Sequence, residues 1–364
     1  MKILLITHDT KNNSGWGRLS GSIGKSLVSA GLNIDFVVES KNSVSQILIK
    51  KTNTVFNLLL NIIKIRIISK KYDVVHALDV WPYGFLGYFA VVGTRKKLFI
   101  NAVGTYSVAP LDSFWKKRAL EVVFKRAQRI FSISSYVQKE ILNKIKKLDK
   151  IEVVHLGFSS LEKINNQDVD YYSKKFSLDL YKRPIILTVG AIKNRKGQLN
   201  TLLAVNKLVN IYPNIHYVMV GDNSDKVYFD KIQNFIKENN LQKNVSIFSS
   251  ISSDKELSFF YNACDLFVMN SNNHKGHIEG FGLVFLEAAS FGKPVVGSRD
   301  CGIEDAIKDG FNGYLANQGD TDDISNKIDY ALKNKSILGL NSLEFVKSFS
   351  WDKTVSRYIT FYNK

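Results

Sequence analysis

The 364-residue sequence has few cysteines and few prolines, two and five respectively. Cys264 and Cys301 lie far apart in the chain, each among apolar or small residues. This placement argues against a disulfide framework and against a CxxC metal or redox site. We therefore expect a protein of a reducing compartment, the cytoplasm.

Long apolar runs are also missing. The first residues, MKILLITHDT, contain only four consecutive aliphatic side chains, too few for a secretory signal, and are typical of a first strand. The most apolar later stretch, residues 81–93, is interrupted by Pro82, Gly84 and Gly87 and is too short to span a bilayer. We expect a protein that is soluble or peripherally bound to the inner face of the plasma membrane.

Acidic residues are scarce in the first part of the chain. Residues 1–150 hold 25 Lys/Arg against 9 Asp/Glu, whereas residues 151–364 hold 25 against 24, so nearly all of the net charge of +17 lies in the first part. Compositional bias toward lysine explains an overall excess but not this asymmetry, which indicates an anionic partner. No nucleic-acid-binding module or zinc spacing is present, so we expect no nucleic acid and favour an anionic membrane surface.

Two basic segments could make that membrane contact. Residues 54–72 set Phe56, Ile63, Ile67 and two leucines on one helical face near several lysines, and residues 114–129 add six cations. Such helices can lie on anionic lipid. The alternative is that both helices pack on a sheet and leave their lysines in solvent.

Short, nearly all-apolar runs bounded by turn residues recur between helical patterns, and runs of this kind are typical of strands buried on both faces. The first series is 2–7, 33–38, 73–78, 97–103, 129–134 and 151–155; the second is 184–190, 216–221, 244–249, 266–270, 294–298 and 313–316. The repetition predicts two α/β halves with parallel sheets, whose ligands bind beyond the carboxyl ends of the strands.

We expect four segments along the chain. Residues 1–165 form a first Rossmann-like domain, and the polar residues 166–183 form a linker. Residues 184–345 form a second Rossmann-like domain. Residues 346–364 form a closing helix, begun by the N-cap candidate Ser350, that packs back on the first domain.

The strongest motif is HIEGFGLVFLEAASFGKPVVGS, residues 277–298, in which Glu279 and Glu287 flank a Gly-Phe-Gly turn. The apolar helix that follows the turn is expected to be buried all round, so an ionised Glu287 within it needs partners such as ligand hydroxyls. Backbone amides of Phe281, Gly282 and Leu283 would point from the positive end of this helix, which favours a diphosphate.

A second motif, VGAIKNRKGQ (189–198), places Arg195 and Lys196 in a loop between a strand and a helix. Two cations there could hold a leaving diphosphate. An exposed basic loop without a ligand is the plainer interpretation of this motif alone.

Together, VGAIKNRKG, the two glutamates around GFG, KPVV and NGYL resemble the family-four glycosyltransferases, also called glycosyl transferases group 1. The resemblance implies the GT-B fold and a retaining hexosyltransferase that uses a nucleotide-diphosphate sugar. It implies that the domain of residues 184–345 binds this nucleotide sugar and that the domain of residues 1–165 faces the acceptor and the membrane. It implies that Glu287 binds the ribose hydroxyls, that Glu279 lies beside the donor sugar as the catalytic residue, and that Arg195 with Lys196 holds the diphosphate.

The sequence departs from the family pattern at two positions. Many members have an arginine after the glycine where this chain has Ala191, and a histidine before the Gly-Thr element where this chain has Val103. The first departure places more of the phosphate charge on Arg195 and Lys196, and the second puts the usual role of that histidine in doubt.

Two further motifs are ambiguous. Asp320-Thr321-Asp322 resembles a metal-binding DxD element but precedes a helical pattern, so we interpret it as a helix cap and expect neither a metal nor a cofactor. Gly15 and Gly17, with Glu39 about twenty residues on, resemble a dinucleotide fingerprint, but seven residues separate the first strand from Gly15, whereas the fingerprint needs an immediate turn. In a transferase, Gly15 and Gly17 would face the diphosphate or the acceptor.

The sequence thus predicts a retaining, metal-independent transferase that moves a hexose-type sugar to a lipid-linked or polysaccharide acceptor in the biosynthesis of surface glycans such as lipopolysaccharide. The alternatives are a nucleotide-sugar epimerase or phosphorylase on the same fold and, less favoured, an NAD-linked Rossmann oxidoreductase.

Overall fold

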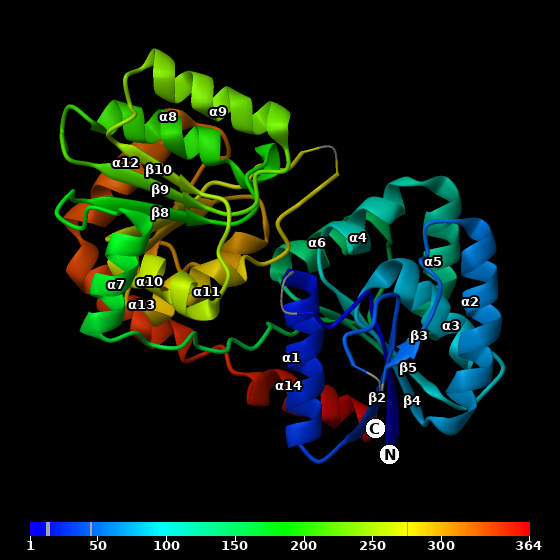
Figure 1. Ribbon diagram of the computed structural model, residues 1–364. Coiled ribbons are helices and arrows are strands. Elements are labelled where there is room, and N and C mark those ends of the chain that lie inside the picture. The colour runs from blue at the N-terminus through cyan, green and yellow to red at the C-terminus, as the bar shows by residue number, and fades with distance from the viewer. Residues whose placement is uncertain (12–14, 44–45, 275) are drawn as a thin grey trace. The chain divides into compact units, whose positions relative to one another are not determined.

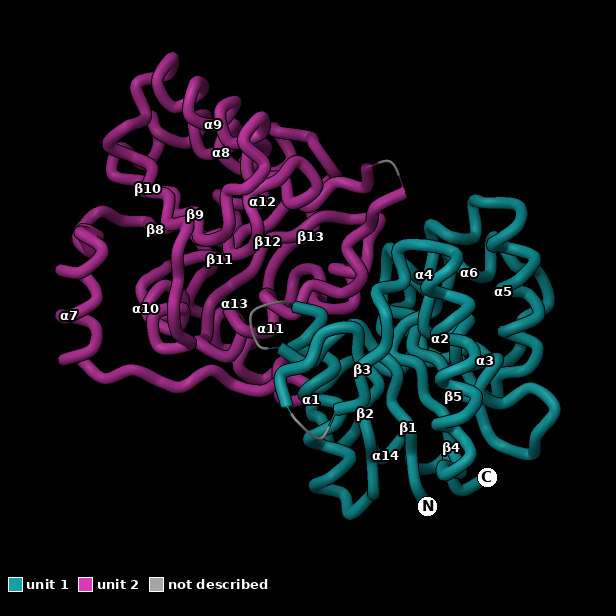
Figure 2. The backbone as a smooth tube through the Cα atoms, turned by 45° about the vertical axis from the view of Figure 1, so that its right-hand side comes forward, with its two compact units in different colours: residues 1–157, 349–364 teal, residues 158–348 magenta. Residues whose placement is uncertain are grey.

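The computed structural model describes residues 1–11, 15–43, 46–274 and 276–364 (Figure 1). The chain divides into two units (Figure 2). Unit 1 comprises residues 1–157 and 349–364, and unit 2 comprises residues 158–348. Each unit is an α/β structure around one parallel sheet.

Unit 1 has a sheet in which all strand pairs are parallel, seven strands among the described residues. Their spatial order is β3 (Ile47–Leu48), β2 (Asn33–Val38), β1 (Lys2–Ile6), β4 (Val74–Ala77), β5 (Lys97–Ala102), β6 (Arg129–Ser132) and β7 (Ile151–Val153). Each predicted strand of the first series is present within two residues of its expected ends; β3 was not predicted, because two residues carry no periodicity.

The helices of unit 1 connect these strands. They are α1 (Gly15–Ser29), α2 (Val55–Ile68), α3 (Phe85–Val91), α4 (Thr105–Val108), α5 (Phe114–Arg126), α6 (Ser135–Lys144) and α14 (Trp351–Tyr362), with short helical segments at Ser69–Lys71, Val80–Gly84 and Ala109–Asp112. The central strands β4 and β5 are almost wholly buried, which is why their sequences are apolar without alternation.

Unit 2 repeats the design with six strands among its described residues, all paired in parallel. Their order is β10 (Val245–Phe248), β9 (His216–Val220), β8 (Ile185–Val189), β11 (Leu266–Met269), β12 (Val295–Ser298) and β13 (Gly313–Ala316). The helices are α7 (Asn166–Phe176), α8 (Gln198–Leu208), α9 (Lys226–Glu238), α10 (Asp254–Ala263), α11 (Leu283–Ser290), α12 (Thr321–Lys333) and α13 (Lys335–Val346), with short segments at Asn194–Lys196 and Gly302–Asp305.

The unit boundary differs from the one expected from sequence. It falls after Gly157 rather than after residue 165, and the expected linker 166–183 belongs to unit 2. Most of its first part is the helix α7, whose Phe176 contacts Phe260 of α10 with ring centroids 4.9 Å apart. A single aromatic stripe on an otherwise polar helix produced the weak periodicity that suggested a linker.

The last helix, α14, is part of unit 1. The hydroxyl of Tyr362 lies 2.5 Å from Nδ1 of His76 on β4, and Nε2 of His76 lies 2.9 Å from the side-chain oxygen of Asn101 on β5. The Asn101 amide in turn donates to the hydroxyl of Tyr358. Buried polar groups with matched partners therefore hold this helix on the sheet in one position.

Both sheets share a topological feature that positions ligands. The strand order reverses beside the first strand of each unit, between β1 and β4 in unit 1 and between β8 and β11 in unit 2. The loops that follow these neighbouring strands lead away in opposite directions and leave a crevice at the carboxyl ends. Functional side chains are therefore expected in these two pairs of loops.

We predict that His76 makes unit 1 sensitive to acid. Burial lowers the pKa of His76 to about 4, so between that value and its unfolded pKa of about 6.5 the unfolded chain binds the proton and the folded chain does not. The contribution of His76 to stability is therefore lost as the pH falls through this window, by about 2 kcal/mol between pH 7 and pH 5.

Urea unfolding of the wild type and of His76→Gln at several pH values tests this. Burial raises the pKa of Asp79 to about 7, and this carboxyl titrates in the same window with the opposite sign. Asp79 is present in both proteins, so the difference between them isolates the histidine. A difference in unfolding free energy that stays constant from pH 7 to pH 5 would contradict the prediction.

Candidate functional site

The candidate site lies in unit 2, in the two loops that flank its switch point. The loop after β8 carries Arg195 and Lys196 in the short helical segment Asn194–Lys196. The loop after β11 carries Glu279. A backbone hydrogen bond from Asn272 to the carbonyl of Arg195, 2.8 Å long, joins the two loops.

The structure brings three of the predicted residues into one ion cluster. Oε2 of Glu279 accepts hydrogen bonds from Nη1 of Arg195 at 2.6 Å and from Nζ of Lys196 at 2.7 Å. Each of the three side chains is only 13% to 21% exposed. Glu279 lies more than eighty positions from Arg195 and Lys196 in the sequence, and the adjacency of β8 and β11 brings them together.

The cluster determines the charge of Glu279. Burial would raise the pKa of this carboxyl, but the charges of Lys196 and Arg195 and their hydrogen bonds outweigh burial and lower its pKa to about 2. Glu279 is therefore ionised at any physiological pH. It holds the two cations in place and has no proton to give.

Sequence reasoning missed a third cation in this loop, Lys193. Burial lowers the pKa of Lys193, and the positive charges of Arg195 and Lys196 lower it further. Three cations against one carboxylate leave an excess of positive charge in a half-buried loop. The signal was available, because Lys193 belongs to the same basic motif as the two predicted residues.

The helix α11 begins where the glutamate loop ends. Gly282 is its N-cap with φ of 85°, a left-handed conformation that favours glycine and turns the chain into the helix. The buried side chain of Phe281 precedes it, and Leu283 begins the first turn, whose amides have no acceptor within the helix. The backbone amides that were predicted to bind a diphosphate therefore lie at the start of α11, which is eight residues long.

Helix α11 is not buried all round, contrary to the expectation from its apolar sequence. Leu283, Glu287 and Ser290 share one stripe, which is only half-buried, while Phe285 and Leu286 face the core. The carboxylate of Glu287 accepts a hydrogen bond from the hydroxyl of Tyr261 on α10 at 2.7 Å. This bond supplies a protein partner where we expected only ligand hydroxyls, and the half-buried stripe leaves Glu287 accessible.

Gly15 and Gly17 lie in unit 1, at the start of α1. Gly15 is exposed and no atom would crowd a side chain there. Gly17 is buried, and a Cβ would lie 2.1 Å from the carbonyl oxygen of Lys11 and 2.3 Å from the carboxylate of Asp9. Position 17 therefore requires glycine because α1 packs closely against the loop after β1. The diphosphate or acceptor role of Gly15 and Gly17 stays a prediction.

The DxD-like acids cap a helix, as interpreted from the sequence. The side chain of Asp320 accepts hydrogen bonds from the backbone amides of Asp322 and Asp323, and Thr321 begins α12. Within the described parts of the chain, no three His, Cys, Asp or Glu side chains are grouped so that they could hold a metal ion.

Residues 172–343 match the family model of the glycosyl transferases group 1. Among relatives, the uncharacterized glycosyltransferase MJ1178 of Methanocaldococcus jannaschii is 27% identical over 294 residues, which cover 79% of this chain and 74% of that protein. A trehalose synthase of Thermococcus litoralis is 27% identical over 70% of this chain and 61% of that protein.

Solved structures share the whole two-unit fold. A glycosyltransferase from Rickettsia africae superposes with a TM-score of 0.84 at 20% identity, covering 99% of this chain and 97% of that one. Anabaena Alr3699/HepE, solved in complex with UDP, superposes with a TM-score of 0.84 at 17% identity, covering 99% and 100%. Together with the sheet topology, the solved structures show the GT-B fold, and residues 172–343 of unit 2 match the glycosyl transferases group 1.

Proposed function

We propose that this glycosyltransferase moves a hexose-type sugar, with retention at the anomeric carbon and without a metal ion, from a nucleotide-diphosphate sugar to a lipid-linked or polysaccharide acceptor. The observation that carries the proposal is the cluster of Arg195, Lys196 and Glu279 at the switch point of unit 2. The UDP held by the structurally similar HepE supports a nucleotide donor.

The cluster suits the stabilisation of a leaving diphosphate. The cations Lys193, Arg195 and Lys196 outnumber the carboxylates of Glu279 and Asp222 that act on them, so positive charge remains for phosphate oxygens. Their side chains are already oriented before the ligand arrives, and such preorganised charge is usually the largest single contribution to catalysis. The amides at the start of α11 would add to it.

The proposed reaction needs no protein base. The bond from the anomeric carbon to the leaving phosphate oxygen breaks, and the acceptor oxygen forms its bond on the same face of the sugar. The acceptor's hydroxyl proton passes to the departing phosphate oxygen. Glu279, ionised and held by two cations, contributes by positioning these cations beside the donor sugar.

Glu287 is proposed to bind the ribose. Its carboxylate lies on the half-buried stripe of α11 and is oriented by Tyr261, which leaves acceptor capacity for ligand hydroxyls. Two vicinal hydroxyls of a ribose can donate to one carboxylate.

Unit 1 is proposed to contact an anionic membrane at the cytoplasmic face. Helix α2 faces its own unit with Asn61 and Ile65, whereas its apolar residues Phe56, Ile63 and Ile67 are 60% to 69% exposed. Helix α5 exposes Phe114 and Trp115, which is 80% exposed, beside three cations, and α3 packs against both helices. Exposed apolar and basic side chains on neighbouring helices suit the interface of an anionic bilayer. None of the helices in the described parts of the chain combines the length and apolar character that crossing a bilayer needs.

The first prediction concerns the ion cluster. Lys196→Met should lower kcat/KM for sugar transfer by about 10² or more, because it removes a preorganised cation from the leaving group. Glu279→Gln should lower kcat but tighten nucleoside-diphosphate binding by roughly fivefold, because a competing anion is removed. Thermal-shift measurements with UDP-, GDP-, ADP- and dTDP-sugars would identify the nucleotide base of the donor. Calorimetry would then measure the affinity for the nucleoside diphosphate, and NMR would determine the anomeric configuration of the product. Equal loss of affinity in both variants, or an inverted product, would be incompatible with the proposal.

The second prediction concerns Glu287. Wild type should bind the selected nucleoside diphosphate about tenfold more tightly than its 2′-deoxy analogue, since one hydroxyl-to-carboxylate bond is lost. Glu287→Ala should bind both ligands equally weakly. Tyr261→Phe is the matched control, because it removes the hydroxyl that donates to Glu287 but keeps the Glu287 carboxylate. This variant should still bind the ribose-containing diphosphate more tightly than its 2′-deoxy analogue. Unchanged discrimination in Glu287→Ala would contradict the assignment.

The third prediction concerns the membrane. Ile63→Asp and Ile67→Asp should each reduce binding to vesicles of phosphatidylcholine and phosphatidylglycerol by at least about tenfold, because an inserted isoleucine contributes about 2 kcal/mol. Ile211→Asp in unit 2 is the matched control, as Ile211 and Ile67 are both 61% exposed. Co-sedimentation of the protein with the vesicles at low and at high salt measures this binding. Wild type that stays in the supernatant at low salt would overturn membrane docking.

A further inference from the structure

The loop that carries Glu279 also carries two histidines whose backbones pair with each other. The amide of His274 donates to the carbonyl of His277 at 3.0 Å, and the amide of His277 donates to the carbonyl of His274 at 2.9 Å. Gly276, with φ of 76°, helps to turn the chain between them. The two histidines therefore form one hydrogen-bonded pair of an antiparallel bridge.

A pair of this kind determines where the two imidazoles begin. Residues directly opposite each other in an antiparallel bridge place their side chains on the same face, with Cβ atoms about 5 Å apart. Rings that start at this separation can converge on one metal ion at a Zn–N distance of about 2.0–2.1 Å. The HxxH spacing alone does not predict this geometry, because in an extended strand it places the histidines on opposite faces.

Both imidazoles are available to a ligand. His274 and His277 are exposed, and within the described parts of the chain neither ring has a hydrogen-bond or ion-pair partner. The carboxylate of Glu279, two residues after His277, is held by Arg195 and Lys196. No third His, Cys, Asp or Glu among the described residues joins the pair. The site thus offers two nitrogen ligands and leaves the other positions of a bound ion to water.

The paired histidines stand on an anchored base. On one side, the amide of Asn273 donates to Oε1 of Gln318 at 2.7 Å, and its side-chain nitrogen donates to the carbonyl of Asp300 at 2.7 Å. On the other side, the side chain of Ile278 is buried, and its carbonyl accepts a hydrogen bond from Arg195 at 3.3 Å. Anchors on both sides keep the two histidines in register, which reduces the entropy that an ion must overcome in ordering its ligands.

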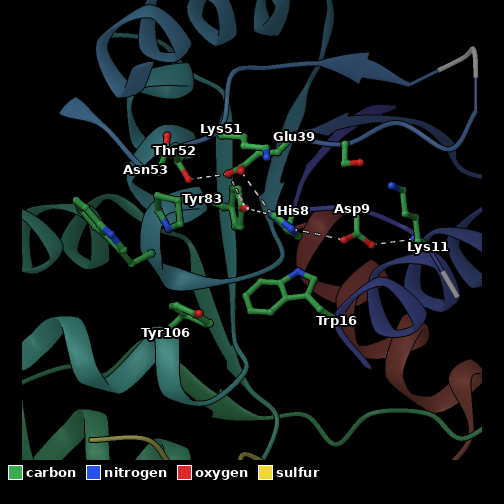
Figure 3. A pocket seen from close by; sticks show the side chains of 13 residues that line it. His8, Asp9, Lys11, Trp16, Glu39, Lys51, Thr52, Asn53, Tyr83 and Tyr106 are labelled. Carbon is green, nitrogen blue, oxygen red and sulfur yellow. Dashed lines mark hydrogen bonds and ion pairs between the residues drawn. The ribbon is translucent and has the colours of Figure 1, made fainter. Parts of the chain in front are cut away.

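The other four of the six histidines have less suitable surroundings. His8 lies in a cavity of about 710 Å³ at the switch point of unit 1, where its two ring nitrogens face carboxylates at 3.5 Å and 3.7 Å (Figure 3). His76 and His216 are buried. His155 is exposed, but no strand pairing among the described residues places a second histidine opposite it.

Two imidazoles favour one class of ion. Nitrogen ligands of this kind suit Zn²⁺, Cu²⁺ and Ni²⁺, whereas Mg²⁺, Ca²⁺ and Mn²⁺ prefer the oxygens of carboxylates and carbonyls. For a given set of ligands, the affinity rises from Mn²⁺ through Ni²⁺ to Cu²⁺ and is lower again for Zn²⁺.

We propose that His274 and His277 together bind one Zn²⁺, Ni²⁺ or Cu²⁺ ion, and that the bound ion stabilises the loop that carries Glu279. An ion held by both side chains opposes opening of the bridge, because opening separates its two ligands. The proposed sugar transfer uses no metal, so this ion acts on the loop alone.

Calorimetry of the untagged, metal-free protein tests the site, with Zn²⁺, Ni²⁺ and Mg²⁺ as the probes. One Zn²⁺ or one Ni²⁺ should bind per chain, and Mg²⁺ should not bind. His274→Gln and His277→Gln should each weaken Zn²⁺ binding by at least about tenfold, because one of two ligands is lost. His155→Gln is the matched control at another exposed histidine and should bind Zn²⁺ as the wild type does. Equal Zn²⁺ affinity in the wild type and in both variants of the pair would overturn the proposal.

Electron paramagnetic resonance with Cu²⁺ identifies the ligands in the wild type, so it does not depend on the stability of a variant. One equivalent of Cu²⁺ should show coupling to two imidazole nitrogens in the wild type and to one in His277→Gln. Coupling to a single imidazole in the wild type would show that the ion binds one surface histidine only, and the shared site would be wrong.

Hydrogen exchange tests the effect on the loop. The amides of His274 and His277 are protected while the bridge is closed. At a free Zn²⁺ concentration ten times the Kd, their exchange should therefore slow by about tenfold in the wild type. Zn²⁺ should not slow exchange in His277→Gln. Unchanged exchange in Zn²⁺-saturated wild type would contradict the stabilising role.

Discussion

Both units depend on one constraint, the burial of a parallel sheet on both of its faces. Strands such as β4 and β8 have no solvent-facing side, so their side chains are apolar or fully hydrogen-bonded. Ionisable groups are then concentrated in the loops at the carboxyl ends. The reversal of strand order opens a crevice there in each unit, and it holds an ion cluster in unit 2 and a carboxylate-lined cavity in unit 1.

The ion cluster of Arg195, Lys196 and Glu279 shows how neighbouring cations keep a buried carboxylate ionised. Burial alone would favour protonated Glu279, but two cations within hydrogen-bonding distance reverse that preference. The result is a carboxylate that stays ionised and cations that are oriented without a ligand. Such a site has little reorganisation left to do when a diphosphate arrives. The same pairing means that a diphosphate bound as proposed would share Arg195 and Lys196 with Glu279.

Much of the fold was predictable because its determinants are local. Twelve apolar runs predicted strands, and the order of motifs in unit 2 indicated the family. What could not be predicted depends on contacts between distant residues: the pairing of Glu279 with Arg195 across β8 and β11, or the hydrogen bond from Tyr261 to Glu287. Helix α7 was missed because its only apolar stripe is aromatic and short. The cavity of unit 1 was missed because its lining residues come from five separate stretches of the chain.

The structure shows where the positive charge of unit 1 lies. An excess of sixteen positive charges in residues 1–150 suggested that the first domain meets an anion. Its cavity, however, is lined by two carboxylates, Asp9 and Glu39, and two cations, Lys11 and Lys51. Among the cations outside it, Lys64 on α2 and Lys116 and Arg118 on α5 are exposed beside exposed apolar side chains. The excess positive charge of unit 1 therefore lies outside this cavity. Attraction to an anionic bilayer, as proposed for this unit, needs only net charge and falls with salt.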